Sequence, residues 1–303
     1  VLRNSGNDNM GLQFHDGFMT GLTVDMDIDR QAFQPSVVYI NGEYWGILNI
    51  REKVNEHFVA ENHNLDPDSV NLLELESDII FGSNADYLKI LQFLNANTSL
   101  VSEYNYSRMK EQIDINNYIQ YQLTEIYLNN TDWPGNNIKF WNTTNPNSKF
   151  RWILFDTDFG YGIWNESDYK ENTLEFALSP NGPSWPNPPW STLLFRRLVT
   201  NISFRHNFIN QYCDRLNTNF LPSVINHKLD SLKDLFNTEI QYNFNRWWGD
   251  YNSWLSSIND KKAFGRSRPS YARAHLKSKF GLGNQFTISV DVSDENSGRV
   301  KVN

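Results

Sequence analysis

The chain has 303 residues, which at about 150 residues per domain predicts two domains or lobes. Hydrophobic residues make up 39% of the sequence and aromatic residues 15%, so low-hydrophobicity disorder is excluded and a packed globular protein is predicted. The formal net charge of -8 excludes the basic footprint of a nucleic-acid-binding protein, and no apolar run approaches the ~20 residues that span a bilayer.

Residues 1–50 are predicted to form β structure, and the clearest element there is a hairpin. Asn41-Gly42 separates two β-rich runs over 37–40 and 43–50, and Asn-Gly is a strong hairpin signal because both turn residues take positive φ. Apolar residues at helical spacing follow Arg51. We therefore expect the second strand to lead directly into a helix, with Glu52 at the junction.

The middle of the chain changes from strand to helix periodicity. Residues 64–84 are predicted to be a connection that contains one short strand over 70–75. Apolar residues at helical spacing predict helices over 87–94 and 113–127, separated by the polar stretch 95–110. The second half of the chain is therefore expected to be mainly helical.

A loop, a hairpin and a second loop are predicted next. Pro134-Gly135 and the surrounding asparagines indicate a loop over 128–137. Short β runs over 138–141 and 150–155 flank an Asn-rich turn, which predicts a second hairpin that ends in an acidic loop.

The last third of the chain contains an irregular loop, helices and a final β segment. Five prolines between 179 and 190 predict an irregular, lid-like loop. Amphipathic helices are predicted near 192–216 and 222–240. Alternation with period two between 286 and 292, followed by a turn, predicts the start of a further β module within 284–303.

The most informative group of polar residues is Asp132, Asn137, Asp156 and Asp158. If residues 138–155 form a hairpin, its two ends meet, and the acidic loops before and after it share a cleft. Carboxylate and amide oxygens are the ligands that suit Mg²⁺, which substrate phosphates usually complete. An Asp followed five positions later by Asn, then a hairpin and a metal-binding Asp, is the order used in kinase phosphoryl transfer. The alternative is that these side chains only close turns through Asx hydrogen bonds.

Several ordered motifs also resemble the CotH kinase family, which is named for spore coat protein H. They are LRNSGND at 2–8, YINGEYWGI at 39–47, REK at 51–53, NTDWPGNN at 130–137 and DTDFG at 156–160. The resemblance covers about residues 1–280. It implies an α+β, two-lobed protein-kinase-like fold over 1–283, with a β-rich N-lobe at about 1–80 and a mainly helical C-lobe at about 85–283.

The same resemblance implies an atypical, secreted or surface-associated bacterial protein kinase. It would transfer the γ-phosphoryl group of ATP to Ser or Thr hydroxyls of a protein substrate, with Mg²⁺, or alternatively Mn²⁺ or Ca²⁺. By position, Asp132 is the catalytic residue, either as the general base or as an acid that organises the metal. The implied metal ligands are Asn137, Asp156 and Asp158, with either aspartate as the principal one. The implied nucleotide contacts are Arg3, Arg51, Glu52 and Lys53.

Some features depart from the usual kinase pattern and leave rival functions open. Neither a glycine-rich kinase loop nor a P-loop is present, and His15-Asp16 stands where related chains more often have Arg-Asp. A surface binding or adhesion module on a kinase-like scaffold is the second interpretation, with aromatic residues near 179–190 and 246–254 as the binding surface. A metal-dependent hydrolase is the third. The six histidines form no metal-binding motif, Cys213 has no cysteine partner, and the sequence carries no signal for oligomeric state.

Overall fold

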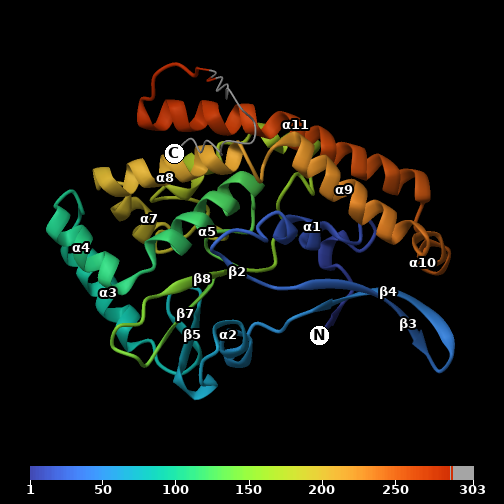
Figure 1. Ribbon diagram of the computed structural model, residues 1–303, viewed down its shortest axis with the longest axis horizontal. Coiled ribbons are helices and arrows are strands. Elements are labelled where there is room, and N and C mark those ends of the chain that lie inside the picture. The colour runs from blue at the N-terminus through green and yellow to red at the C-terminus, as the bar shows by residue number, and fades with distance from the viewer. Residues whose placement is uncertain (287, 289–303) are drawn as a thin grey trace, which may run out of the picture.

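In the computed structural model, which describes residues 1–286 and 288, two β-sheets lie along one side of the molecule and long helices cover the other (Figure 1). The three-stranded sheet has the order β1-β4-β3, and the five-stranded sheet has the order β2-β8-β7-β5-β6. The strands are β1 Leu2–Arg3, β2 Asp29–Arg30, β3 Phe33–Ile40, β4 Glu43–Arg51, β5 Val70–Glu74, β6 Asp78–Phe81, β7 Lys139–Thr143 and β8 Arg151–Leu154.

Asparagine and aspartate side chains begin several of the helices, because their oxygens accept hydrogen bonds from the first free backbone N–H groups. Asn201 accepts from the N–H groups of Ser203 and Phe204, and this cap divides the helical region predicted near 192–216 into two helices. The helices are α1 His15–Gly21, α2 Glu56–His63, α3 Ala85–Ala96, α4 Glu103–Gln112, α5 Ile115–Leu128, α6 Thr173–Ala177, α7 Leu193–Leu198, α8 Ile202–Leu216, α9 Pro222–Asn237, α10 Ile240–Trp247 and α11 Tyr251–Phe280. Within the described residues, no helix combines the length and the apolar character needed to cross a membrane.

Both predicted hairpins are confirmed. Ile40 pairs with Glu43 across the first turn, where Asn41 has φ 53° and Gly42 has φ 82°. In the second hairpin, β7 and β8 are antiparallel, and Lys139 pairs with Ile153. The residues just before β7 and just after β8 therefore lie at the same end of this hairpin.

Three local predictions were wrong. Residues 1–50 are not all β structure, because α1 lies within them; its glycines are weak helix formers, and six of its seven residues are buried, so packing stabilises it. The polar stretch 95–110 contains most of α4, whose only buried residues are Tyr106 and Met109. The connection 64–84 contains two strands, β5 and β6, where one was predicted. Strand β6 has only four residues, which is too short to show a clear period in the sequence. The strands predicted between 286 and 302 fall mainly on residues outside the described part of the chain.

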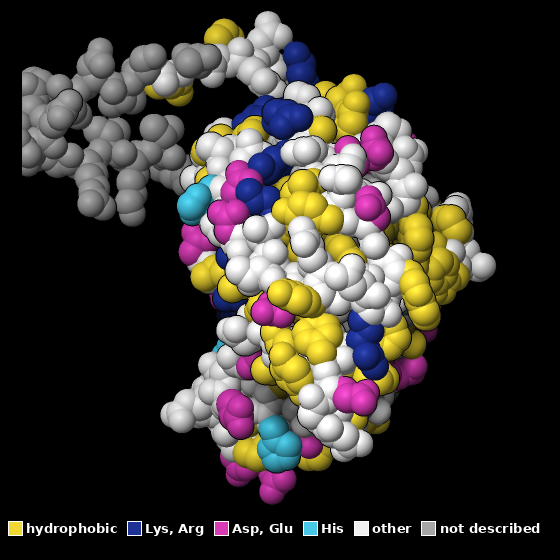
Figure 2. Space-filling model, turned by 90° about the vertical axis from the view of Figure 1, so that its right-hand side faces the viewer, with side chains coloured by type: hydrophobic (Ala, Val, Ile, Leu, Met, Phe, Trp, Pro, Cys, Tyr) yellow, Lys and Arg dark blue, Asp and Glu magenta, His cyan; other side chains and the backbone are white. Residues whose placement is uncertain are grey.

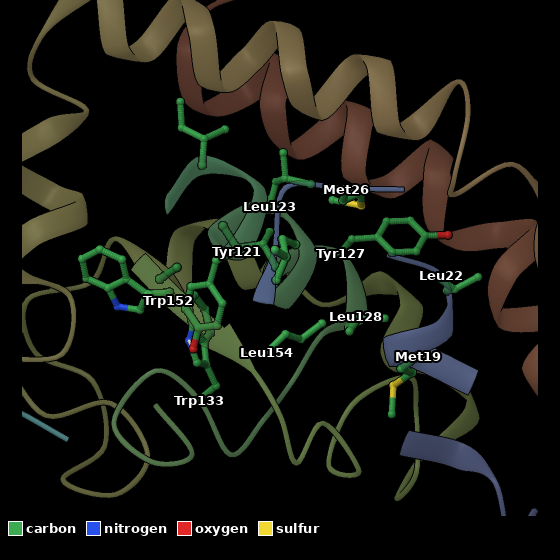
Figure 3. Close-up of a cluster of buried hydrophobic side chains, with 14 of the residues drawn as sticks. Met19, Leu22, Met26, Tyr121, Leu123, Tyr127, Leu128, Trp133, Trp152 and Leu154 are labelled. Atoms are coloured by element: carbon green, nitrogen blue, oxygen red, sulfur yellow. Dashed lines mark hydrogen bonds between the residues drawn. The ribbon is translucent and has the colours of Figure 1, made fainter. Parts of the chain in front are cut away.

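The central element of the hydrophobic core is α5, which is buried from Asn117 to Leu128. Figure 3 shows its side chains Tyr121, Leu123 and Tyr127 between residues of α1 and residues of β8. The end of α5 is therefore fixed by packing on both sides, and the loop that follows it starts from a rigid position. A smaller cluster packs α2 against the five-stranded sheet through Phe58 and Trp141.

Candidate active site

The predicted acidic residues meet at the open end of the β7–β8 hairpin. Asn137 Nδ2 donates a hydrogen bond to Asp132 Oδ2 at 2.8 Å and lies 3.4 Å from the backbone oxygen of Asp156. Asn136 Nδ2 donates to the other carboxylate oxygen of Asp132 at 2.7 Å. The loop after α5 and the loop after β8 are thereby joined, as the hairpin register requires.

Arg3 adds a positive charge from a distant part of the sequence. Strand β1 pairs with β4, with Arg3 opposite Asn49, and this pairing carries the Arg3 side chain to the acidic loop. Its Nη2 atom lies 2.5 Å from Asp156 Oδ1 and 3.3 Å from Asp158 Oδ2. The backbone N–H of Asn7 also donates to Asp158 Oδ2, at 3.1 Å. One guanidinium therefore lies between the two carboxylates that were predicted to bind metal.

Asp156 lies close enough to two other carboxylates to raise their pKa values. Burial, and after it the negative charge of Asp156, raise the pKa of Asp158 to about 6. The pKa of Asp132 is also raised, first by burial and then by the charge of Asp156. The site thus concentrates negative charge, and a cation bound there would relieve the repulsion.

The donor atoms fit a hard divalent cation chemically. Asp156 and Asp158 supply carboxylate oxygens, and Asn137 uses Nδ2 for both hydrogen bonds above, so its Oδ1 is the atom available to a cation. Among residues 1–286 and 288, no three Asp, Glu, His or Cys side chains are grouped as a complete metal site. A cation held by Asp156, Asp158 and Asn137 would need water or phosphate oxygens to complete its coordination, as Mg²⁺ usually does.

The structure does not bring Arg51, Glu52 and Lys53 into this group. Arg51 is 3% exposed, and its Nη2 atom lies 2.7 Å from Asp16 Oδ2, so its charge is already paired in the interior. Glu52 Oε2 accepts a hydrogen bond from the backbone N–H of Ala32 at 2.7 Å, and Lys53 is exposed. The nucleotide contacts that the resemblance implied for these three residues remain predictions.

Two residues that touch the acidic turn were missed as site residues. Asp16 accepts hydrogen bonds from Thr157, which stands between Asp156 and Asp158, and the ring of His15 lies 2.9 Å from the backbone oxygen of Gly160. Their only sequence signal was the His15-Asp16 pair noted above. Nothing in the local pattern indicated that this segment would be a helix packed behind the acidic loop.

Glu125 gives the region around the site a pH dependence. It is fully buried one turn before the end of α5, and its Oε2 accepts a hydrogen bond from Asn130 Nδ2 at 2.9 Å. Burial raises the pKa of Glu125 to about 8, against an ordinary value of 4.5. Between these two values the folded protein keeps a proton that the unfolded chain releases, so this group's contribution to stability is present at low pH and is lost as the pH rises towards 8.

We expect Glu125→Gln to flatten the pH dependence of stability. The free energy of unfolding should fall less steeply for the variant than for the wild type between about pH 5 and about pH 8, by at most about 1.4 kcal/mol per pH unit. Urea unfolding at a series of pH values measures this difference. The exposed residue Glu111, changed to Gln, serves as the control. Parallel curves for wild type and Glu125→Gln would contradict the assignment.

These features define the class of protein. Two sheets and a helical half, with an acidic loop pair at the end of a β-hairpin, form a mixed α+β, kinase-like two-lobed fold. The model of the family described as CotH kinase protein matches residues 1–272, so this chain belongs to the CotH kinase family, and the resemblance predicted from the motifs is confirmed. A search among curated proteins finds no match.

Proposed function

We propose that this chain is an atypical protein kinase that uses ATP and a divalent cation, Mg²⁺ or Mn²⁺, to phosphorylate Ser or Thr hydroxyls of a protein substrate. The observation that carries the proposal is the meeting of Asp132, Asn137, Asp156 and Asp158 at one end of the β7–β8 hairpin. Membership of the family supports the kinase class. A secreted or envelope location is proposed from the same family relationship.

The residues divide into three roles. Asp156, Asp158 and Asn137 would hold the cation, which when bound neutralises charge on the phosphates. Arg3, beside both aspartates, is placed to contact the same phosphates. Asp132 would orient the substrate hydroxyl and accept its proton as the oxygen forms a bond to the γ-phosphorus. The bond from that phosphorus to the bridging oxygen breaks, and ADP leaves with the electron pair. Catalysis then consists mainly of positioning and charge neutralisation.

A cavity of about 400 Å³ supports a place for the nucleotide base. It lies between β4 and α10 and is lined by Trp45, Trp247 and Trp248 together with amide side chains that include Asn4. Gly46 to Leu48 line it too, and they immediately precede Asn49, the residue opposite Arg3 in the sheet. A strand rises about 3.3 Å per residue, so the part of β4 that lines the cavity is only a few residues from Arg3. A nucleotide whose phosphates lie at Arg3 could therefore place its base in this cavity.

The face that carries this cavity is rich in apolar side chains. Figure 2 views the molecule from the side of the β3–β4 hairpin and α10, and hydrophobic side chains gather there. Trp248 is 86% exposed, and the rings of Trp45 and Trp247 lie 5.2 Å apart. Aromatic faces and amide groups suit a flat base with hydrogen-bonding edges. A larger cavity, of about 540 Å³, is lined by Asp8, Glu166 and Asp260 together with Trp164 and Lys261.

Thermal unfolding tests the proposed function. ATP and Mg²⁺ together should raise the melting temperature more than either alone, because a ternary site stabilises the fold only when both are bound. Asp156→Ala should lose this added shift, and the wild type should transfer the γ-phosphoryl group of ATP to itself or to a Ser- or Thr-containing protein. Absence of both nucleotide binding and phosphoryl transfer in the wild type would overturn the proposal.

The same experiment separates the rival functions. Exposed Trp164 and Trp185 both pack on Phe159, next to the acidic turn, and they favour a binding surface as the second candidate. If the protein is a binding module, the Asp156→Ala variant should bind its partner as the wild type does. The wild type itself should then show no phosphoryl transfer. A hydrolase should release free phosphate from ATP without forming a phosphoprotein.

A further inference from the structure

We propose that His15 and Asp16, the first two residues of α1, form a clamp that positions the acidic turn 156–160 from its buried side. The side chains of the α1 clamp bind Thr157 and Gly160 and not the three proposed metal ligands, so His15 and Asp16 are positioning residues. The inference rests on the proposed function only for its effect on cation binding. The effect on the turn itself follows from contacts alone.

Asp16 holds the turn at Thr157. Its Oδ1 atom accepts one hydrogen bond from the Thr157 backbone N–H at 3.0 Å and another from the Thr157 hydroxyl at 2.8 Å. Its Oδ2 atom is paired with Arg51 Nη2 at 2.7 Å. Thr157 is 0% exposed and Asp16 is 7% exposed, so water does not compete strongly for these bonds. Arg51 thus fixes the orientation of Asp16, and Asp16 fixes Thr157.

His15 holds the other end of the same turn. Its Nε2 atom lies 2.9 Å from the backbone oxygen of Gly160. Burial lowers the pKa of His15 to about 3, so the ring is neutral and donates this bond through one N–H. Two successive residues of one helix therefore bind positions 157 and 160, three residues apart in the turn.

The helix that carries the clamp is itself held in place. Asp8 accepts hydrogen bonds from the backbone N–H of His15 at 3.0 Å and from that of Leu12 at 2.7 Å. Met19 of α1 is fully buried, and Figure 3 shows Met19 and Leu22 on the same side of the core as the end of α5. A clamp on a packed helix can resist rotation of the turn, whereas one on a mobile loop cannot.

The conformation of the turn explains why a clamp is needed. Asp156 has φ 52°, in the left-handed region that residues other than glycine, asparagine and aspartate rarely adopt, and contacts around the turn add to the stability of this conformation. The N–H and hydroxyl of Thr157 both donate to Asp16 on the buried side of the turn. The carboxylates of the two neighbouring residues, Asp156 and Asp158, contact Arg3 instead. Loss of the clamp should allow the turn to relax and the two carboxylates to separate.

Thr157→Val tests the clamp, because it replaces the hydroxyl with a methyl group of similar size and leaves Asp16 paired with Arg51. Thr157→Ser restores a hydroxyl, and Thr124→Val is the matched control: Thr124 is equally buried and donates its hydroxyl to Gln120 O at 2.7 Å, away from the turn. The readouts are amide hydrogen exchange in residues 156–160 and the affinity for Mn²⁺ alone.

We expect Thr157→Val to speed exchange in the turn and to weaken Mn²⁺ binding about tenfold, the lower end of the range for changes that disturb the orientation of metal ligands. Thr157→Ser should behave as wild type, and Thr124→Val should change neither quantity. Exchange in the turn that is the same for Thr157→Val and Thr124→Val would overturn the clamp. If wild-type protein binds no Mn²⁺, the proposed metal site fails, and the exchange data still decide whether the clamp exists.

Discussion

Asp132→Asn is expected to slow phosphoryl transfer by about 10²–10⁴-fold, which is the usual range for loss of a general base. The carboxylate is held at both oxygens, by Asn136 at 2.7 Å and Asn137 at 2.8 Å, so its position is set before substrate arrives. An amide at position 132 cannot accept the proton of the substrate hydroxyl. It also places its own NH₂ group against one of these two asparagine donors, so one hydrogen bond is lost.

The binding of nucleotide should survive this substitution. The proposed phosphate and cation contacts come from Arg3, Asn137, Asp156 and Asp158, which Asp132→Asn leaves in the chain. Steady-state rates with saturating ATP and Mg²⁺, together with a direct titration of ATP, separate the two effects. Asp86→Asn is the control, since Asp86 is a residue of α3 whose side chain is 47% exposed and paired with Lys89 at 2.7 Å. A wild-type turnover rate for Asp132→Asn would remove Asp132 from the catalytic role.

Arg268→Ala is expected to have the largest effect on stability, a loss of about 3–5 kcal/mol in the free energy of unfolding. Arg268 lies in α11 and is 1% exposed. Its guanidinium donates to the backbone oxygens of Tyr127 at 2.9 Å, Tyr169 at 3.0 Å, Glu171 at 2.7 Å and Ile126 at 2.6 Å, and to Thr173 Oγ1 at 3.0 Å. Alanine would leave a cavity and several buried acceptors without a donor, and each unsatisfied group is costly.

A neighbouring arginine provides the matched control. Arg266 is on the same helix two residues earlier and is exposed, so Arg266→Ala should change stability by no more than about 0.5 kcal/mol. Arg268→Lys keeps the charge but not the five donors of the guanidinium, and should fall between the two. Urea unfolding measures all three variants. Equal unfolding midpoints for Arg268→Ala and Arg266→Ala would show that the buried hydrogen bonds are not what stabilises this region.

Local turn chemistry and strand register explain what the sequence could predict. Asn41-Gly42 specifies a turn with two positive φ values, and the two short β runs around 142–149 require their ends to meet. That register was enough to bring Asp132, Asn137 and Asp156 together. These predictions succeeded because each depends on residues no more than 24 positions apart.

Contacts between distant segments explain what the sequence could not predict. Arg3 reaches Asp156 across 153 positions, and Asp16 reaches Thr157 across 141. No local pattern distinguishes Arg51, which is buried and paired, from an arginine that faces a ligand. The short helix α1 was also hidden, because Gly17 and Gly21 lower its helix propensity and its stability comes from packing.

The position of Arg268 in α11, 110 positions after Asp158, has a consequence for synthesis on the ribosome. A nascent chain that has emerged only as far as α9 already carries the acidic residues Asp132, Asp156 and Asp158 of the candidate site. It still lacks the guanidinium that binds the last carbonyl groups of α5, the helix from which the loop of Asp132 departs. The polypeptide therefore gains this buried donor after the groups that the donor must organise, and the C-terminal half can complete its packing only once α11 has emerged.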